Sequence, residues 1–245
     1  MREVRLFIDA PLEPGCELRL PASAARHALR VLRLKVGDRV TLFNGDGRQY
    51  VARLLAGGER HACARIDTVA APERESALRL TLVQALARGE KMDWVVQKAT
   101  ELGAVSIVPV VSTRSEVRLD AVRGEKRVDR WRAIAIAACE QSGRNVLPKI
   151  AVPLALEAFL AADTAPTPAA RWVLQPGQPG GLRSLGALPP AMTIAVGPEG
   201  GFDDGDLSRL RAADYRELTL GPRILRTETA GIAALAALQA VYGDL

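Results

Sequence analysis

Two glycine-rich loops near the end of the chain carry the residue types best suited to ligand binding. The apolar run 192–196 ends in GPEGGF at 197–202, after which Asp203 or Asp204 can cap a helix. The run 215–220 ends in GPRILR at 221–226, and Thr227 is the expected cap of a long Ala-rich helix. Glycines let the backbone approach a ligand closely, and helix N-termini offer free N–H donors. Each loop alone is typical of an ordinary turn, but together they predict a binding crevice in an α/β sheet.

A second polar group lies earlier in the chain. Residues 113–116 (TRSE) follow a predicted strand, Val105 to Val111, at the end where α/β proteins place function. Residues 140–144 (EQSGR) end a predicted helix. Gly143 explains this sequence as a helix end, but it does not explain Gln141 or Arg144.

Five stretches together resemble one family. They are GPEGGF at 197–202, LGPRILRTETA at 220–230, RHALRVLRLKVGD at 26–38, KMDWVVQKATELGAV at 91–105 and RWRAIAIAACEQSGR at 130–144. They span nearly the whole chain and occur along it in the same order as in the family that they resemble. This family is the RsmE-type uridine-N3 methyltransferases of 16S ribosomal RNA, within the SPOUT superfamily. The resemblance implies an α/β C-terminal domain with a trefoil knot and a mostly parallel sheet, at residues 73–245. It also implies a PUA-like RNA-binding β-barrel at residues 1–72.

The resemblance implies S-adenosylmethionine (SAM) as the cofactor, bound mostly by backbone groups and a flat apolar slot. The expected cofactor-binding residues are Leu174, Gly197, Pro198, Glu199, Gly200, Gly201, Leu220, Gly221, Ile224, Leu225, Arg226 and Thr227. Glu199 either accepts a hydrogen bond from the ribose or offsets the sulfonium charge, or it is a structural carboxylate bonded to loop N–H groups. The loop at 175–181, after a strand at Trp172 to Leu174, resembles the first loop of the pocket by position.

Methyl transfer to uridine N3 requires the base to be placed in line with the methyl group and the N3 proton to leave. Arg226, Glu140 and Arg114 are the expected catalytic residues. Arg226 contacts the methionine carboxylate or the RNA, or polarises a uracil carbonyl; alternatively it pairs with Glu228 or Glu199. Glu140 is either the general base or a carboxylate that orients Arg114.

The net charge of +5 gathers in the first third of the chain. Residues 1–72 hold 12 Lys and Arg against 8 Asp and Glu, as expected if this part contacts a phosphate backbone. Helical spacing predicts a helix over Ala22 to Leu34 with an arginine face. This face is equally typical of a solvated helix surface, and His27 of a packing or capping residue. The expected RNA-binding residues are Arg26, His27, Arg30, Arg33, Lys35, Arg114, Gln141 and Arg144.

The rest of the sequence predicts short strands and a hairpin at Asn44-Gly45-Asp46-Gly47 in residues 1–70, then alternating strands and helices after a boundary at Pro72 to Ser76. The expected helices are Glu90 to Leu102, Glu125 to Gln141, Pro153 to Ala161 and Thr227 to Tyr242, and Asp163 to Ala170 is an expected surface loop. The last helix is apolar nearly all round, and the resemblance implies a homodimer through it.

Composition excludes several classes of protein. No apolar run approaches the ~20 residues of a membrane span, and no signal peptide is evident, so we expect a cytoplasmic protein. Three dispersed cysteines and two histidines predict no metal site. No G-x-G-x-x-G follows an early strand, which disfavours a nicotinamide enzyme. Two alternatives stay open: a SPOUT enzyme for another RNA or atom, and a non-catalytic ribosome-assembly factor that does not bind SAM.

Overall fold

The computed structural model describes the chain except residues 1–3, 56–61, 117–120, 163–168, 178–180, 183, 184 and 188, and the side chains of 121–123. The predicted loop from Asp163 to Ala170 therefore lies largely outside the described residues. The chain forms two compact units. The first comprises Met1–Glu75 and Cys139–Leu147, and the second Ser76–Ala138 and Pro148–Leu245.

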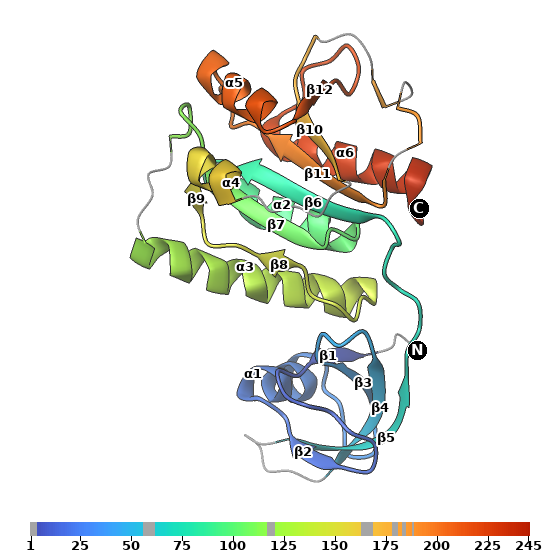
Figure 1. Ribbon diagram of the computed structural model, residues 1–245. Coiled ribbons are helices and arrows are strands. Elements are labelled where there is room, and N and C mark those ends of the chain that lie inside the picture. The colour runs from blue at the N-terminus through green and yellow to red at the C-terminus, as the bar shows by residue number, and fades with distance from the viewer. Residues whose placement is uncertain are drawn as a thin grey trace. The chain divides into compact units, whose positions relative to one another are not determined.

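The first unit is a curled five-stranded sheet with strand order β1-β3-β4-β5-β2 (Figure 1). Its strands are β1 (Arg5–Phe7), β2 (Glu17–Arg19), β3 (Arg39–Phe43), β4 (Gln49–Leu55) and β5 (Cys63–Ala70). Alternate side chains point inward, as the twofold period of a strand requires, and build a core that includes Leu6, Leu42, Tyr50, Leu54 and Ile66. The predicted hairpin joins β3 to β4, with Gly45 and Gly47 at positive φ.

The helix predicted over Ala22 to Leu34 is shorter and less regular than expected. An α-helical turn, α1 (Ala22–Arg26), runs into a π-helical turn, η1 (His27–Val31). The helix ends because Arg33 adopts a left-handed conformation with φ of 54°. The stretch from Leu32 to Lys35 therefore does not continue the predicted helical face.

The second unit is built on a parallel sheet with strand order β12-β10-β11-β6-β7-β8, and β9 also pairs with β7. All of these pairings are parallel. The strands are β6 (Arg79–Ala85), β7 (Ser106–Val111), β8 (Lys149–Ile150), β9 (Leu154–Ala155), β10 (Ala170–Leu174), β11 (Ala191–Val196) and β12 (Arg216–Leu218). The prediction of an α/β fold with a mostly parallel sheet after a small β domain is confirmed. The trefoil knot stays a prediction.

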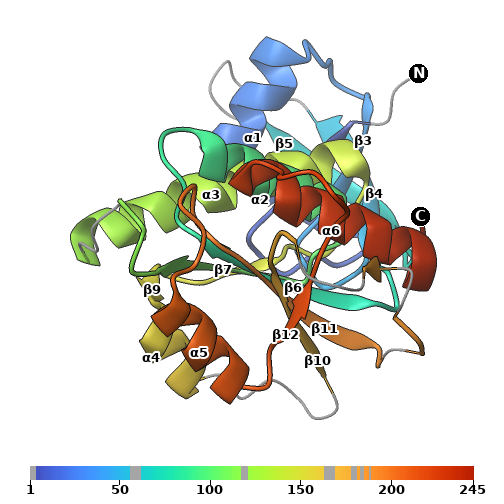
Figure 2. The ribbon, with the colours of Figure 1, turned by 90° about the horizontal axis from the view of Figure 1, so that it is seen from above.

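Helices cover both faces of this sheet (Figure 2). One face carries α2 (Lys91–Glu101), α3 (Ala121–Ser142) and α6 (Thr227–Tyr242), and the other carries α4 (Leu156–Ala162) and α5 (Asp204–Ala212). Two apolar clusters follow from this layering, one with Leu80, Leu82 and Leu235, the other with Val83 and Leu207. Burial on both faces explains the near-continuous apolar runs of these strands.

The starts of α3 and α4 and the cap of α6 differ from their predictions. Helix α3 begins at Ala121, not Glu125, and α4 begins at Leu156 because Leu154 and Ala155 pair with β7. Asp203 caps α5 as predicted, and the hydrogen bond from Asp206 N–H lowers its carboxyl pKa. Thr227 does not cap α6: the N-cap is Arg226, which makes no side-chain capping bond. In the described part of the chain, no helix is long and apolar enough to cross a membrane.

Candidate active site

A pocket of about 520 Å³ opens at the carboxyl ends of β10, β11 and β12. Three segments form most of its wall: the end of β10 with Gln175 and Pro176, the loop at 196–202, and the segment from Leu218 to Thr227 with Ala230. Lys91, at the start of α2, completes the lining. Parallel strands bring these loops to one edge of the sheet, which is where this architecture places ligands.

The first loop turns so tightly that it depends on glycine. A Cβ at Gly197 would lie 2.9 Å from the backbone nitrogen of Phe202 and 3.1 Å from the carbonyl carbon of Gly201. Gly200 is different, since a Cβ there would meet the Arg114 side chain at 3.5 Å, an ordinary contact. Gly197 therefore lets the loop fold back on itself and bring backbone groups to the pocket wall.

Lys91 joins the first pocket loop to the first turn of α6 by charge. Its Nζ lies 2.8 Å from Glu199 Oε1 and 3.5 Å from Glu228 Oε2. Glu199 Oε1 also accepts a hydrogen bond from Arg88 N–H at 3.2 Å. The hydrogen bond with Glu199 raises the pKa of Lys91. Burial alone would raise the pKa of Glu199, but the bonds from Lys91 and the backbone outweigh it and lower that pKa. Lys91 therefore stays charged at neutral pH and is a poor proton acceptor.

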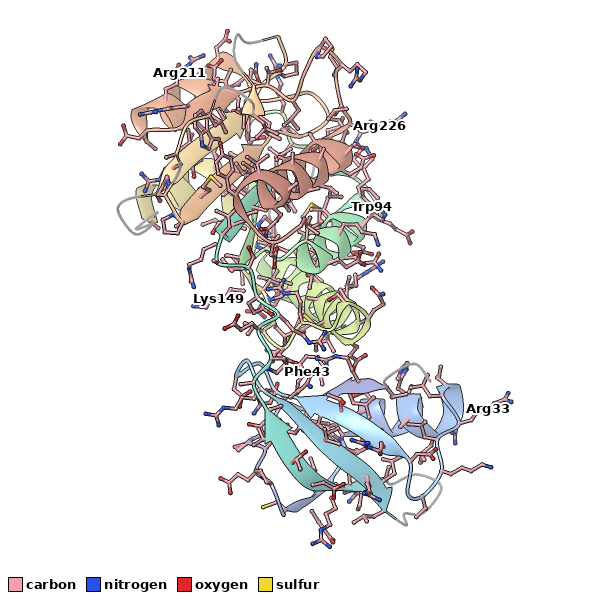
Figure 3. The ribbon with its side chains drawn as sticks, turned by 90° about the vertical axis from the view of Figure 1, so that its right-hand side faces the viewer. Arg33, Phe43, Trp94, Lys149, Arg211 and Arg226 are labelled. Carbon is pink, nitrogen blue, oxygen red and sulfur yellow. The ribbon has the colours of Figure 1, made fainter. Side chains whose placement is uncertain are left out.

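Arg226 differs from Lys91 in that its guanidinium has no partner among the residues that the structure describes. It is exposed, lines the pocket, and forms no ion pair with any described residue. Figure 3 shows it pointing outward from the start of α6. The predicted alternative, pairing with Glu228 or Glu199, is not what the structure has, because both carboxylates face Lys91. A guanidinium without a partner beside a pocket is available to an anion or to a carbonyl oxygen.

Arg114 lies over the first loop. Its Nη1 donates to the carbonyl of Gly200 at 2.9 Å. The neighbouring Thr113 is held by the buried Asp206, which accepts from both its N–H and its hydroxyl. The end of β7, the loop at 197–202 and the start of α5 are thereby fastened together within the second unit.

The pocket contains most of the residues predicted for the cofactor. Of the twelve, Gly221 alone is absent from the lining, although it lies between lining residues Leu220 and Arg223. The lining also includes nine residues outside that list of twelve: Lys91, Gln175, Pro176, Val196, Phe202, Leu218, Thr219, Arg223 and Ala230. Gln175 and Pro176 belong to the loop at 175–181, which was expected to form the first loop of the pocket. Lys91 stands in the stretch 91–105 that carried the family resemblance, which is the one signal that pointed to it.

The residues predicted from EQSGR at 140–144 lie in the first unit. Glu140 accepts a hydrogen bond from Phe7 N–H at 3.0 Å; burial raises its pKa and that bond opposes the rise. Arg144 is only 4% exposed, and its Nη2 lies 2.6 Å from Glu75. A buried, paired guanidinium cannot reach a phosphate, so the predicted RNA contact of Arg144 is replaced by a structural role. Gln141 is exposed.

The basic stretch, residues 26–35, lies on the surface of the first unit. Arg26, Arg30, Arg33 and Lys35 are exposed, and none forms an ion pair with a described residue. Figure 3 shows Arg33 pointing away from its sheet. Val31, within the stretch, and Val36, directly after it, are 64% and 67% exposed. His27 is half-buried, and its charge lowers the pKa of Glu140, against the larger effect of burial.

No group of three or more His, Cys, Asp or Glu side chains is placed to hold a metal ion in the part of the chain that the structure describes.

Comparison with known proteins gives the class of this protein. A family model described as an RNA methyltransferase domain matches residues 74–239, and a model of an RNA methyltransferase PUA domain matches residues 20–67. The first match alone covers more than half of the chain. The chain is therefore an RNA methyltransferase that carries a PUA domain.

Relatives define the family more narrowly. Ribosomal RNA small subunit methyltransferase E of Synechocystis is 32% identical, over 91% of this chain and 72% of that protein. The enzyme of the same name from Neisseria gonorrhoeae, in a crystal structure bound to SAM, is 36% identical with a TM-score of 0.92, and the match covers 100% of both chains. A putative methyltransferase from Legionella pneumophila in complex with SAM is 37% identical with a TM-score of 0.94, also over 100% of both chains. The chain belongs to the ribosomal RNA small subunit methyltransferase E family.

Proposed function

We propose that this protein transfers the methyl group of SAM to N3 of a uridine in 16S ribosomal RNA. One observation carries the proposal. The two loops that the sequence singled out, at 197–202 and 220–230, converge on one pocket in a chain that matches SAM-bound family members over its whole length. The same pocket in an unrelated fold would support only small-molecule binding.

The pocket suits SAM by size and by lining. Its volume of about 520 Å³ lies within the ~300–1,000 Å³ typical of small-molecule sites. Leu174, Leu220, Ile224 and Leu225 offer apolar surface for a flat adenine ring. The loop that turns at Gly197 brings backbone donors and acceptors to the wall. Because Gly197 has no room for a Cβ, backbone groups rather than side chains recognise the ligand there.

When bound, SAM supplies an electrophilic methyl group on a sulfonium. The chain must place the uracil against that methyl and stabilise the anion left when N3 loses its proton. Arg226 is the proposed group for this, because it lines the pocket and has no partner among the described residues. Its guanidinium donates to a uracil carbonyl and lowers the cost of removing the N3 proton. Arg114, bonded to Gly200, is proposed to orient the loop and the RNA beside it.

Glu140 is the proposed general base. Burial raises the pKa of its carboxyl, which brings the group closer to the pH at which a base works well. Glu140→Gln is expected to remove turnover and to leave SAM affinity unchanged. If Glu140→Gln keeps turnover, its carboxylate serves the first unit alone, through Phe7.

RNA recognition is proposed for residues 1–72, with the basic stretch as its main contact, and catalysis for residues 73–245.

We also propose a cytoplasmic homodimer that buries the apolar side chains of α6. In support, Val241 of α6 is 62% exposed, and Trp94 on the neighbouring α2 is 44% exposed (Figure 3). Sedimentation of the purified protein measures the dimer directly.

The decisive experiment uses labelled SAM and small ribosomal subunits that lack their own modification. After incubation, the RNA is digested to nucleosides and analysed by mass spectrometry. N3-methyluridine in 16S RNA is the expected product. Methylation of another nucleoside would retain the enzyme class and change the substrate. Absence of both transfer and SAM binding would support an assembly factor without catalysis.

A further inference from the structure

The side-chain amide of Gln84 is buried behind the pocket wall and bonds a residue that lines the pocket. Gln84 belongs to β6 and is fully buried. It pairs in register with Val196, the last residue of β11 before the loop at 197–202. Its neighbours on the same face of β6, Leu80 and Leu82, belong to the apolar core. Gln84 itself does not line the pocket.

Gln84 begins a chain of two hydrogen bonds that reaches the pocket wall. Its Nε2 lies 2.9 Å from Thr227 Oγ1 and 3.1 Å from the carbonyl of Ala85. Thr227 Oγ1 lies 2.5 Å from the carbonyl oxygen of Gly197. Three segments that are far apart in sequence therefore meet here: the end of β6, the first pocket loop and the first turn of α6.

The direction of these bonds is fixed by chemistry. A carbonyl oxygen only accepts, so the single hydroxyl hydrogen of Thr227 goes to Gly197. The hydroxyl oxygen must then accept from Gln84. Since the carbonyl of Ala85 also accepts, both neighbours require the NH₂ side of the amide. The opposite orientation of the Gln84 amide would place its oxygen against two acceptors.

This orientation leaves the oxygen of Gln84 without a hydrogen-bond partner among the described residues. It faces α6, where a Cβ at Gly231 would approach it to 3.2 Å. A buried carbonyl without a partner destabilises a fold, and an apolar side chain here would continue the core of β6. Stability alone therefore does not account for an amide at this position.

Thr227 supports the same view. The threonine at the start of a helix commonly caps it, but this hydroxyl bonds Gly197 and Gln84 instead, and α6 begins without a side-chain cap. Gly197 and Thr227 both line the pocket. The bonds thus tie the first loop to the start of the second loop's helix.

We propose that Gln84 is a positioning residue of the SAM pocket. By donating to Thr227, it leaves the hydroxyl hydrogen free to hold the Gly197 carbonyl, and so it keeps the two pocket loops at the spacing that the cofactor needs. This inference rests on the proposed SAM-dependent function. Gln84 does not line the pocket, so it acts on the cofactor only through the positions of the two loops. The expected effect of replacing it is therefore a change in SAM affinity.

The test compares two buried glutamines, Gln84, which contacts the start of α6, and Gln239, which belongs to α6. Gln239, also fully buried, accepts from Ser76 and donates to the carbonyl of Leu102 near the far end of that helix. Full-length Gln84→Leu and Gln239→Leu are compared with the wild type by calorimetric SAM binding, thermal unfolding, and steady-state methylation of unmodified small subunits. Gln84→Leu is expected to raise the Kd and KM for SAM about tenfold, with kcat within about twofold. Gln239→Leu is expected to lower the melting temperature and leave the SAM Kd unchanged.

Thr227 supplies a second pair of variants should Gln84→Leu not fold. Thr227→Ser keeps the hydroxyl that holds Gly197, so Thr227→Val is expected to weaken SAM binding more than Thr227→Ser does, and as much as Gln84→Leu. Combining Gln84→Leu with Thr227→Val is expected to cost no more than Thr227→Val alone, because both break one chain of bonds.

The outcomes separate the two proposals. If the wild type binds SAM and Gln84→Leu binds it equally well, or if Thr227→Val does, the positioning role is wrong and the proposed function stands. If the wild type itself binds no SAM, the proposed function fails and the positioning role fails with it.

Discussion

The pocket of the second unit and the basic stretch of the first unit use charge in opposite ways. In the pocket, Lys91 is engaged by Glu199 and Glu228, and two arginines of the lining, Arg223 and Arg226, form no ion pair with a described residue. In the basic stretch, Arg26, Arg30, Arg33 and Lys35 all lack such a partner. The pocket is a preorganised site with its charges already arranged, and the stretch is a surface of free cations.

This difference matches the two ligands proposed. A small cofactor is bound by fixed groups at fixed distances, so displacing a loop by about 1 Å lowers binding or activity strongly. An RNA backbone is attracted by summed charge, which falls gradually as single cations are removed and as salt rises. We therefore expect point changes to act steeply in the pocket and gradually in the basic stretch.

Gly197→Ala is the change with the largest expected effect. A methyl group there would lie 2.9 Å from the Phe202 nitrogen, so the loop cannot keep its path. SAM binding is expected to fall by more than about a hundredfold, measured by calorimetry. The matched control is Gly200→Ala, whose methyl would meet only the Arg114 side chain at 3.5 Å. Equal losses in both variants would contradict a tight turn at Gly197.

Arg226→Gln tests a pocket cation that forms no ion pair with a described residue. If the guanidinium stabilises the uracil anion, kcat is expected to fall about 10²–10³-fold, while the Kd for SAM changes by only a few-fold. Single-turnover methylation of unmodified small subunits gives the rate of the chemical step. Arg211→Gln, on the outer helix α5 where Arg211 pairs with Glu217, is the control and should keep the full rate. If Arg226→Gln loses SAM affinity and keeps the rate of the chemical step, Arg226 binds the cofactor and does not stabilise the uracil anion.

Lys91→Met removes the cation between two carboxylates and is expected to weaken SAM binding about tenfold. Its effect on stability depends on pH. The raised pKa of Lys91 makes its contribution complete below the ordinary value of 10.5 and lost at higher pH. The lowered pKa of Glu199 makes its contribution complete above the ordinary value of 4.5 and lost as pH falls.

The difference in melting temperature between the wild type and Lys91→Met should therefore be largest between pH 4.5 and pH 10.5 and should become smaller as the pH falls below 4.5. Lys98→Met is the matched control, because Lys98 lies on the same helix, pairs with Glu101 and does not line the pocket. A difference that persists undiminished in acid would mean that the aliphatic stem of Lys91, and not its charge, stabilises the pocket.

The sequence predicted the parts of the site that depend on local structure. Strand, glycine loop and helix follow one another in the chain, so GPEGGF and GPRILR could be placed at the ends of strands, and nearly all of the predicted cofactor residues line the pocket. The core strands were equally accessible, because burial on both faces leaves continuous apolar runs. Gln84 was visible as a polar residue at the end of such a run, but its partner was not.

The misses are residues whose role depends on a distant partner. Lys91 and Glu199 are 108 positions apart, and Gln84 and Thr227 are 143 apart. No local pattern encodes these pairs. Arg144 looked like a free cation because its partner Glu75 is likewise remote. Thr227 was expected to cap α6, but Arg226 is the N-cap, and the Thr227 hydroxyl bonds the carbonyl of Gly197, which is also remote in sequence.

The smallest expected effect belongs to the basic stretch. Arg30→Gln with Arg33→Gln removes two exposed cations and no described ion pair, so stability and SAM affinity should not change. RNA affinity is expected to fall about tenfold at moderate salt, and the slope of log K against log salt to fall by about 1.4–1.8, since each of the two phosphate contacts contributes ~0.7–0.9. Titration of unmodified small subunits at several salt concentrations measures both.

Arg53→Gln is the matched control, because this exposed arginine of the same unit already pairs with Asp67 and should change the slope less. The two slopes decide between charge and shape. A reduced slope with a gradual loss would support a surface that reads phosphates. An unchanged slope with a large loss would mean that the stretch binds RNA through Val31 and Val36, and that the first unit, like the pocket, recognises its ligand by fit.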